Sequence, residues 1–536
     1  MKTHTNRTSP DTDRKNSKAF LVGGGIASLA SAVYLIREAQ VPGENILIME
    51  QGDICGGALD GSGSVEEGYL IRGGRMHEEH FGCTWDLLSG IPTLEDSAKS
   101  VTEEIFEFNR KVVTCSHSRL LKSGRKMDVS SYGLSMRDKA DMLRLMYHSE
   151  EALGDKQIRD WFSPDFFNTV YWLLWSTTFA FQPWSSVVEM KRYSIRFIHL
   201  LPDFNKLGGI MRTVYNQYDS VILPIQEWLQ AQGVRFMFNT RVININFDIN
   251  NTAKTAVAIE FDQAGKQEKI ALSRQDNVFV TLGSIVEDSS VGSMSKPAVL
   301  STFPLPGTWA LWKNIAAQHP DFGHPEVFCD HIDMSKWMSF TVTLKDPAFF
   351  AHMEEFTGNI AGTGGLVTCA DSNWFMSVVL AYQPHFRNQP DDVFVFWGDG
   401  LLPDQEGNYV KKKMTDCTGE EILIELFNHL GVLDKMQPIM EKTNCIPCMM
   451  PYIDSEFMPR KPGDRPQVVP EGAENFAFLG QFVEVPQDCV FTVEYSVRTA
   501  QTAVCTLMGL DKEVTPIYEG HHDIQVLLNA MTAINR

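Results

Sequence analysis

The sequence contains too few cysteines for a scaffold held together by disulfides. Ten cysteines are spread over 536 residues, whereas small secreted domains that depend on disulfides are far richer in this residue. Residues 1–18 are polar and show no secretory signal, so we expect a disordered lead-in there. Both absences favour a cytoplasmic protein.

Long hydrophobic runs are absent as well. The longest aromatic-rich stretch, residues 166–181, is bounded by prolines and carries polar side chains, which makes it too short and too polar to cross a bilayer. Peripheral contact with the inner surface of a membrane stays compatible with the sequence, although no strongly basic amphipathic segment supports it.

Positive charge is scarce. With 47 Lys and Arg against 67 Asp and Glu, the net charge is −20, which argues against a nucleic-acid partner. An anionic substrate must therefore be bound by local donors rather than by a general basic field. The hydrophobic and charged fractions, 43% and 21%, are ordinary for a globular protein.

Metal-binding patterns are sparse. Cys445 and Cys448 have the CxxC spacing of redox and zinc sites, but no second CxxC and no histidine pair stands at zinc-finger spacing. We interpret this pair as structural and expect no metal site.

Residues 19–50 have the pattern of a dinucleotide-binding βαβ unit. An apolar strand at 20–22 leads into the string GGGIAS, a helix follows to Arg37, and a second strand at 46–49 ends at Glu50. The order of strand, glycines, helix, strand and acid predicts a bound dinucleotide.

Four residues of this unit are candidate ligands of the dinucleotide. Gly23 permits the tight turn, and Gly25 lets backbone N–H groups approach a pyrophosphate at the helix N-terminus. Ser28 stands at the position of the usual third glycine and is expected to contact the pyrophosphate too, while Glu50 is placed to bind the adenosine ribose.

Further along, residues 134–229 have mostly helical periodicity and residues 234–261 are rich in strands. A strand at 275–283 returns toward the nucleotide fold, and a last strand at 476–479 enters Gly480 before a helix that starts near 491. Residues 517–536 have the pattern of an amphipathic tail.

Seven strings that occur in order between about residues 18 and 510 resemble the oleate hydratases, also called the myosin-cross-reactive-antigen family. They are GGGIASLASA, GGRMHEEHFGCTWDLLSGIPTLE, FAFQPWSSVVEMKRYSIRFIH, YNQYDSVILPIQEWL, QPHFRNQP, CIPCMMPYIDSEFMPRKPGDRPQVVP and GQFVEVPQDCVFTVEYSVRTA. The resemblance implies an FAD enzyme that adds water across the cis double bond of a free unsaturated fatty acid. With oleic acid the product is 10-hydroxystearic acid, and there is no net redox change.

The resemblance also implies the fold: an α/β protein with a Rossmann-like FAD-binding domain, a mixed substrate domain and a mainly helical cap region. The expected segments are residues 19–133 and 231–300 for the FAD-binding domain, 134–230 for the helical region, 301–440 for the substrate domain, 441–510 for an FAD-closing segment and 511–536 for the tail. Because little chain follows the closing segment, we favour a monomer over a homodimer.

By match to the family, Tyr193 in KRYSIRFIH is the proton donor, with Tyr215 and Tyr218 as alternatives. Gln217 matches a position that contacts substrate near the reacting bond, and His385 matches one that anchors the carboxylate.

The polar groups that accompany this histidine in the family fall here on Val379 and Ala381, which are apolar. The carboxylate is therefore expected to be held differently.

The flavin ring is expected beside the loop of Gly73, Gly74 and Arg75. The closing unit adds a further set of expected contacts: Gly480, Gln481 and Thr492.

The largest departure from the family lies at Met76. The family carries a glutamate directly after GGR, which is held to activate water, and a thioether cannot act as a base. Glu78 or Glu79 could reach the site, backbone and flavin groups could orient the water, or hydratase activity could be lost. We favour the second interpretation because the main barrier is alkene protonation and Tyr193 is retained.

Two other functions share this pattern. An FAD oxidoreductase that acts on a lipid or an amine has the same nucleotide fold. A non-catalytic flavoprotein that binds fatty acids is consistent with Met76.

Overall fold

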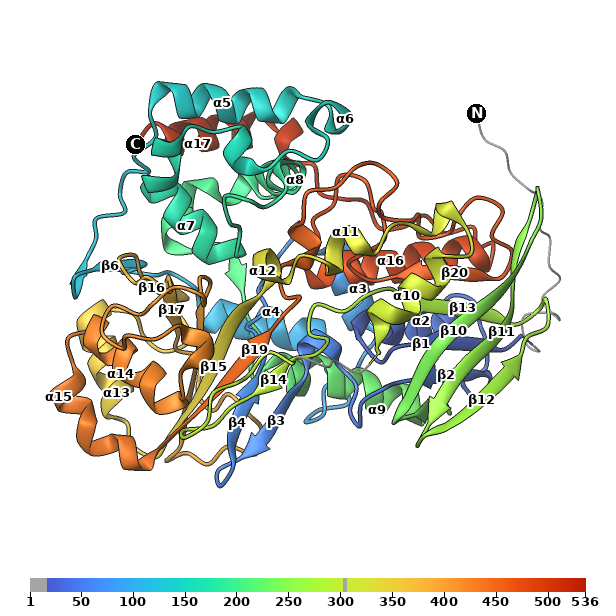
Figure 1. Ribbon diagram of the computed structural model, residues 1–536, viewed down its shortest axis with the longest axis horizontal. Helices are drawn as coiled ribbons and strands as arrows, with labels where there is room; N and C mark the ends of the chain where they lie inside the picture. The colour runs from blue at the N-terminus through green and yellow to red at the C-terminus, as the bar shows by residue number, and fades with distance from the viewer. Residues whose placement is uncertain (1–16, 302–305) are drawn as a thin grey trace.

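The computed structural model describes residues 17–301 and 306–536. The expected disordered lead-in, residues 1–18, lies outside the described part except for its last two residues. A five-stranded parallel sheet has the order β20-β13-β1-β2-β9 (Figure 1). These strands span Phe476–Leu479, Asn277–Thr281, Ala19–Val22, Ile46–Met49 and Arg235–Met237, respectively.

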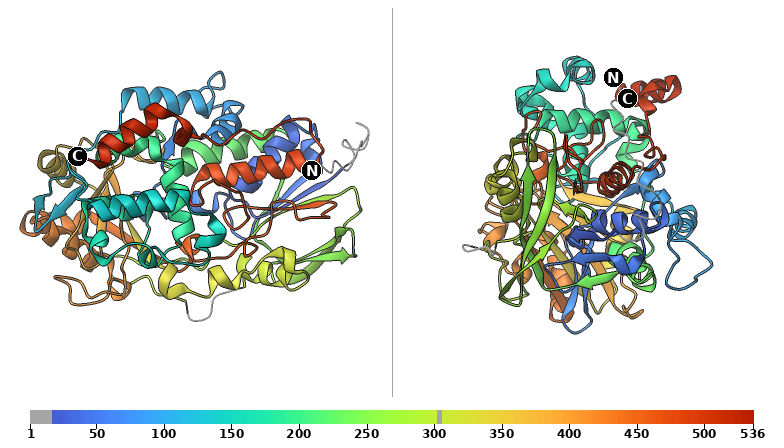
Figure 2. Two further views of the ribbon diagram at one scale, coloured as in Figure 1. Left: turned by 90° about the horizontal axis from the view of Figure 1, so that it is seen from above. Right: turned by 90° about the vertical axis from the view of Figure 1, so that its right-hand side faces the viewer.

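Both faces of this sheet are covered, which explains why β1, β2 and β20 are apolar and buried throughout. Helices α2 (Ile26–Arg37) and α16 (Val493–Leu507) pack together on one face. The antiparallel strands β10 (Thr240–Ile249), β11 (Lys254–Gln263) and β12 (Lys266–Ala271) lie on the other (Figure 2). The predicted strand–helix–strand unit of residues 19–50 is confirmed, including the helix end at Arg37.

An eight-stranded sheet forms the second half of the molecule, in the order β14-β19-β15-β18-β17-β16-β6-β7. Its strands span Ser290–Val291, Thr443–Met450, Trp337–Leu344, Phe394–Gly400, Met376–Val379, Leu366–Cys369, Leu120–Lys122 and Arg125–Lys126. Helices α13 (Ala348–Thr357) and α14 (Gly419–His429) contribute Phe349 and Phe427 to a second hydrophobic core behind this sheet.

Three helices of the helical region lie at the top of Figure 1: α5 (Met136–Tyr147), α7 (Val170–Phe179) and α8 (Val187–Arg196). The fourth, α9 (Leu223–Ala231), lies at the bottom of the view and packs against α2. The C-terminal helix α17 (Ile524–Ile534) packs against the short helical segment η5 (Ile198–Lys206) that follows α8. None of the helices within residues 17–301 and 306–536 is long and apolar enough to cross a bilayer.

The two sheets do not follow the expected domain boundaries. Strand β19 begins at Thr443 and pairs with β15, so the predicted FAD-closing segment from residue 441 contributes to both sheets. Likewise β6 and β7 leave the first FAD-binding segment to join the large sheet. Hydropathy does not show which distant strands pair, so the boundaries expected from the sequence differ from those of the two sheets.

Strand β4 (Gly68–Ile71) joins the two halves through side chains of β15. The amide of Tyr69 donates to Thr343 Oγ1 (2.9 Å), and the amide of Ile71 donates to Thr341 Oγ1 (3.1 Å). Thr341 Oγ1 in turn donates to the Ile71 carbonyl (3.1 Å). Two buried hydroxyls therefore fix the strand that leads into the loop of Gly73 and Arg75.

We expect Thr341→Val to lower the free energy of unfolding by about 1–3 kcal/mol, because it leaves the buried amide and carbonyl of Ile71 without their partner. Denaturant unfolding measures this loss. Thr341→Ser keeps the hydroxyl and serves as the control. Equal losses in the two variants would contradict this role of the hydroxyl.

Candidate functional site

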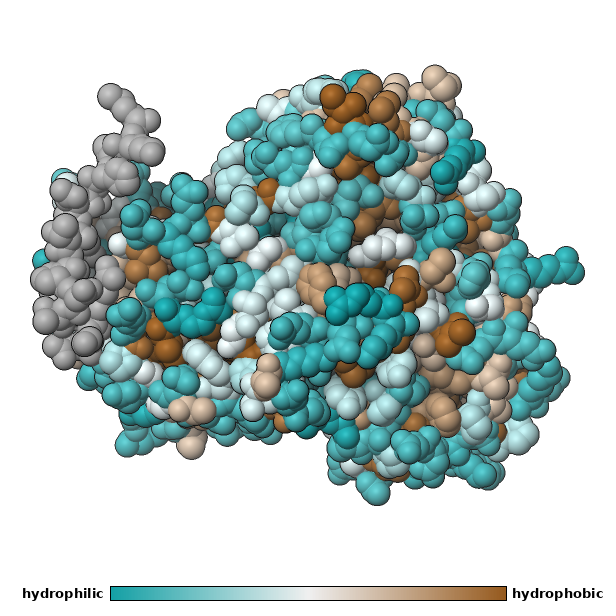
Figure 3. Space-filling view, turned by 180° about the vertical axis from the view of Figure 1, so that it is seen from behind, coloured by the Kyte–Doolittle hydropathy of each residue, from teal (hydrophilic) through white to brown (hydrophobic). Residues whose placement is uncertain are grey.

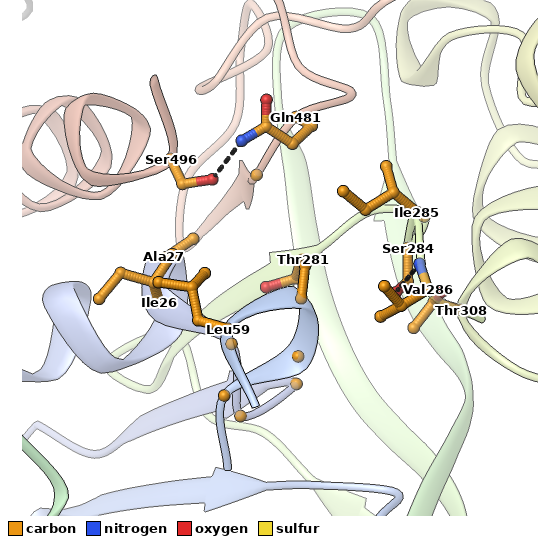
Figure 4. A pocket seen from close by; sticks show the side chains of 18 of the residues that line it. Ile26, Ala27, Leu59, Thr281, Ser284, Ile285, Val286, Thr308, Gln481 and Ser496 are labelled. Atoms are coloured by element: carbon orange, nitrogen blue, oxygen red, sulfur yellow. Dashed lines mark hydrogen bonds between the residues drawn. The ribbon is translucent and has the colours of Figure 1, made fainter. Parts of the chain in front are cut away.

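A cavity of about 430 Å³ opens at the carboxyl ends of the parallel strands. Glycine-rich turns after β1, β13 and β20 form much of its wall, as Figure 4 shows around Ile26, Thr281 and Gln481. The lining comprises residues 23–27, 50–52, 56–59, 283–287, 480–482 and 491–493 together with Arg72, Arg75, Thr281, Ser496 and Thr308.

The turn before α2 presents backbone rather than side chains to this cavity. Gly23 has φ of +92°, a conformation that L-residues avoid. Gly25 is the N-cap of α2 without a side-chain cap, and a Cβ there would meet nothing within 4 Å. Free N–H groups of a helix N-terminus beside open space suit a phosphate group.

Glu50 comes directly after β2 and lines the cavity. Its carboxylate accepts hydrogen bonds from the amides of Gly24 (2.5 Å) and Gly52 (2.6 Å). Burial raises the pKa of Glu50, while the hydrogen bonds from these amides oppose the rise. These hydrogen bonds therefore fix the carboxylate of Glu50, the residue predicted to bind the ribose, at the cavity.

Three predicted flavin contacts do not line the cavity: Ser28, Gly73 and Gly74. Ser28 is buried, and its Oγ contacts the Val22 carbonyl (3.4 Å) and Thr281 Oγ1 (3.1 Å). Its side chain therefore fills the contact between helix and sheet. This is the packing role of the third glycine in the usual motif.

Arg75 is the member of its loop that reaches the cavity. Its Nη2 donates to the Ala58 carbonyl (3.2 Å), and the guanidinium lies 5.2 Å from the centre of the Phe491 ring. Burial lowers the pKa of Arg75 to about 10, so the group stays cationic near neutral pH.

Gln481 holds the closing loop in place. Its side-chain oxygen accepts from the amide of Phe491 (2.6 Å), and its Nε2 donates to the carbonyl of Thr492 (3.0 Å) and to Ser496 Oγ (2.8 Å; Figure 4). Gly480, Gln481 and Thr492, all predicted flavin contacts, line the cavity.

Tyr193 on α8 is enclosed by aromatic rings and is only 2% exposed. The rings of Phe179 and Phe181 lie 5.0 Å from it. Its hydroxyl donates to the carbonyl of Val490 (2.6 Å), the residue before Phe491 in the cavity wall. Burial raises the pKa of Tyr193 well above its usual value, so the phenol keeps its proton.

Met76 packs at the edge of the main core, and the acids near it are engaged or exposed. The Glu78 carboxylate contacts Arg196 (3.0 Å), His80 (2.9 Å) and His199 (3.4 Å). Burial alone would raise its pKa, but hydrogen bonds from His199 and His80 and the charge of Arg196 lower it.

The side chain of Glu79 is 70% exposed. The local geometry therefore offers no free base next to Met76 from either predicted acid.

Gln217 contacts the loop of Arg75 directly, and His385 contacts the residue before Gln217. Gln217 is buried, and its Nε2 approaches the carbonyl of Arg75 (3.4 Å). The carbonyl of His385 accepts from the amide of Asn216 (2.8 Å). The fold thus brings the segment of residues 216–217 against both Arg75 and His385. The alternative donor Tyr218 is only partly buried, and its amide donates to Asn216 Oδ1 (2.9 Å).

Sequence reasoning missed two ionisable residues near this site. Arg212 precedes Gln217 on the same segment, and its Nη2 is buried without a hydrogen-bond partner among the described residues. Glu456, in the turn η10 (Ser455–Phe457), is fully buried. Asp454 and Arg460 stand close to Glu456 in the sequence, and Arg212 belongs to no recognised motif, so no local pattern singles out either residue.

Cys445 and Cys448 both lie on β19, three residues apart, so their side chains point to opposite faces of the sheet. Accordingly they belong to different hydrophobic cores. Burial raises the pKa of Cys448 to about 12, which supports the structural interpretation of this pair.

Comparison with known proteins extends over nearly the whole chain. An oleate hydratase of Streptococcus pyogenes serotype M49 (strain NZ131) is 41% identical, with 99% of this chain and 91% of that protein covered. A linoleate hydratase of Lactiplantibacillus plantarum is 31% identical, with 96% of this chain and 98% of that protein covered.

A solved structure with a similar fold is cyclohexylamine oxidase from Brevibacterium oxydans IH-35A. It has a TM-score of 0.50 at 12% identity and covers 92% of this chain and 99% of that chain. This likeness concerns the fold alone and confirms the predicted α/β class. The model of the MCRA family matches residues 16–505, and the chain belongs to this family.

Proposed function

We propose that this protein is a fatty-acid hydratase that adds water across the cis double bond of a free unsaturated fatty acid, oleic acid being the expected substrate. The observation that carries the proposal is the 41% identity to an oleate hydratase over 99% of the chain. The buried phenol of Tyr193 beside the cavity wall supports it, since alkene hydration needs a proton donor in a dry site.

We propose FAD as the group that fills the cavity. Gly23 and Gly25 with the N-terminus of α2 suit the pyrophosphate, and Glu50 suits the ribose. Arg75 and the closing loop of Gly480, Gln481 and Thr492 would hold the flavin end. When bound, a reduced flavin supplies negative charge that favours a cation on the substrate, with no net electron transfer.

Tyr193 is the proposed proton donor. The aromatic rings around it exclude water, which otherwise competes for the proton. To donate, the hydroxyl must leave the Val490 carbonyl and turn to the alkene. Gln217, at the loop of Arg75, is proposed to position the substrate near the reacting carbons.

We propose that the carboxylate is held by His385 and Arg212. The backbone of Arg212 is fixed by Asn109, whose Nδ2 donates to its carbonyl (2.7 Å) and whose Oδ1 accepts from its amide (2.9 Å). No salt bridge involves Arg212 in the described part of the chain. Burial and the charge of Arg212 lower the pKa of His385 to about 4, so its imidazole would bind the carboxylate as a neutral hydrogen-bond donor.

A peripheral contact with lipid is proposed for the outer face of α5 and α17, near which hydrophobic residues gather at the top of Figure 3. The exposed apolar side chains are Met136, Leu143 and Tyr147 on α5 and Ile524, Leu528 and Met531 on α17. Exposed Arg137 and Arg144 on α5 would favour anionic headgroups. Cosedimentation with anionic vesicles, compared with neutral ones, tests this contact; self-association through the same face is the opposing outcome.

Oleic acid incubated with the FAD-loaded protein without oxygen in ¹⁸O-labelled water should give a hydroxy acid heavier by one labelled water, detected by mass spectrometry. An oxidoreductase would instead bleach the flavin or consume an acceptor. A fatty-acid-binding protein would leave the substrate unchanged. Either of these results would refute the hydratase.

We expect Tyr193→Phe to lower the hydration rate by at least about 100-fold, because it removes the transferable proton and keeps the ring. Flavin content and fatty-acid binding should persist and are measured beside the product. Tyr215→Phe is the comparison variant. If only this second variant loses turnover, the proton donor is not Tyr193.

We expect Arg212→Gln to weaken binding of oleate by about tenfold or more and to leave binding of methyl oleate unchanged, because only the free acid offers a charge to the guanidinium. Arg387→Gln, which removes an exposed arginine paired with Glu95 (2.9 Å), is the control. Unchanged oleate affinity in Arg212→Gln would remove this residue from the carboxylate site.

A further inference from the structure

Glu456 is a buried acid without the usual compensation. It is 0% exposed, and neither carboxyl oxygen has a hydrogen-bond partner on another described residue. Glu189 is equally buried but contacts Arg460 (2.9 Å) and Arg465 (3.0 Å). Since an unpaired buried polar group costs free energy, Glu456 needs an explanation other than stability.

The arginine closest to Glu456 in the structure does not pair with its carboxyl. The guanidinium of Arg465 donates to the Glu456 carbonyl (2.6 Å) and to the Glu189 carboxylate (3.0 Å), but not to the Glu456 side chain. Burial raises the pKa of Glu456 well above its usual value, and the neighbouring Asp454 adds to the rise. The charges of Arg465 and Arg75 oppose it without cancelling it. These surroundings therefore favour the protonated form of the carboxyl.

The turn that holds Glu456 lies between the phenol and the cavity. The ring of Phe457 is 5.8 Å from that of Tyr193 and 5.5 Å from that of Phe491, which lines the cavity under Arg75. Glu456 thus precedes a residue that packs against both the ring of Tyr193 and the wall of the cavity.

Three other acids near Met76 or Glu456 are paired or exposed. Glu78 is held by Arg196 and two histidines, and Glu79 faces solvent. Asp454 accepts a hydrogen bond from Trp337 Nε1 (3.0 Å). Among these acids only Glu456 combines complete burial, free oxygens and a place beside Tyr193.

We propose that Glu456, a buried acid in the turn that packs against Tyr193, is a proton-transfer residue of the hydration reaction; this role rests on the proposed function. The Tyr193 O–H bond breaks as a C–H bond forms on one alkene carbon. Glu456 then returns a proton to the phenolate through one water molecule and becomes a carboxylate.

The second half of the cycle restores Glu456. The negative carboxylate favours the cation on the other alkene carbon, where a water oxygen forms the C–O bond. The proton that this water loses goes to the Glu456 carboxylate. One water is consumed, and both Tyr193 and Glu456 recover their protons.

Glu456→Gln tests the role, because it keeps the shape and breaks no hydrogen bond to another described residue. We expect a fall in kcat of about 100-fold or more, with flavin content, oleate affinity and unfolding midpoint retained. Glu456→Asp keeps a carboxyl group and should retain part of the activity.

The pH profile separates proton transfer from a structural role. Since the resting carboxyl must be protonated, kcat of the wild type should fall as the pH rises through the pKa of Glu456, and Glu456→Gln should lack this limb. Asp454→Asn is the matched control: burial raises the pKa of Asp454 as well, so this change removes a second buried acid and should keep both the activity and the limb.

A rescue experiment adds a gain of function. Adding Met76→Glu to the Glu456→Gln variant should raise kcat by about tenfold or more over Glu456→Gln alone, since it returns a carboxylate to the site. If Glu456→Gln turns over oleate like the wild type with the same pH profile, the role of Glu456 is refuted while the proposed function stands. If the wild type forms no hydroxy acid, the proposed function itself fails.

Discussion

The hydrogen bond from the phenol of Tyr193 to the carbonyl of Val490 joins two parts of the chain that are far apart in sequence. One end belongs to a helix of the cap region, and the other to the loop that forms the cavity wall. Gln481 fixes that loop from the opposite side through the amide of Phe491. The two hydrogen bonds end on adjacent residues, Val490 and Phe491. The loop therefore helps the helix to set the position of the phenol relative to the cavity.

Buried charge is distributed unequally around the site. Glu189 and Glu78 lie in networks whose arginines and histidines neutralise them, whereas Glu456 and Arg212 have no such partner in the described part of the chain. Paired networks stabilise the framework at best modestly, but an unpaired group is costly and persists where a ligand or a reaction uses it. In a protein of net charge −20, an uncompensated arginine is also the kind of local donor that an anionic substrate requires.

The sequence allowed accurate prediction wherever the signal is local. The strand at 46–49, the helix end at Arg37 and the acid at Glu50 follow from spacing within about 30 residues. It failed where the outcome depends on distant partners: the pairing of β19 with β15, the inward orientation of Ser28, and the burial of Glu456. Motif matching named Tyr193, Gln217 and His385, but it says nothing about a residue such as Arg212 whose importance lies in the partner that it lacks.

The two threonine hydroxyls of β15 that hold β4 have a mechanical consequence. Domain closure by a hinge needs a connection of few contacts, whereas here the strand that leads into the Arg75 loop, and so into the cavity wall, is tied to the large sheet through buried side chains. A gaping motion of the two halves would break these bonds in the interior. A long acyl chain is therefore expected to enter by local displacement of cap helices, while the sheets beneath them move as a single rigid frame.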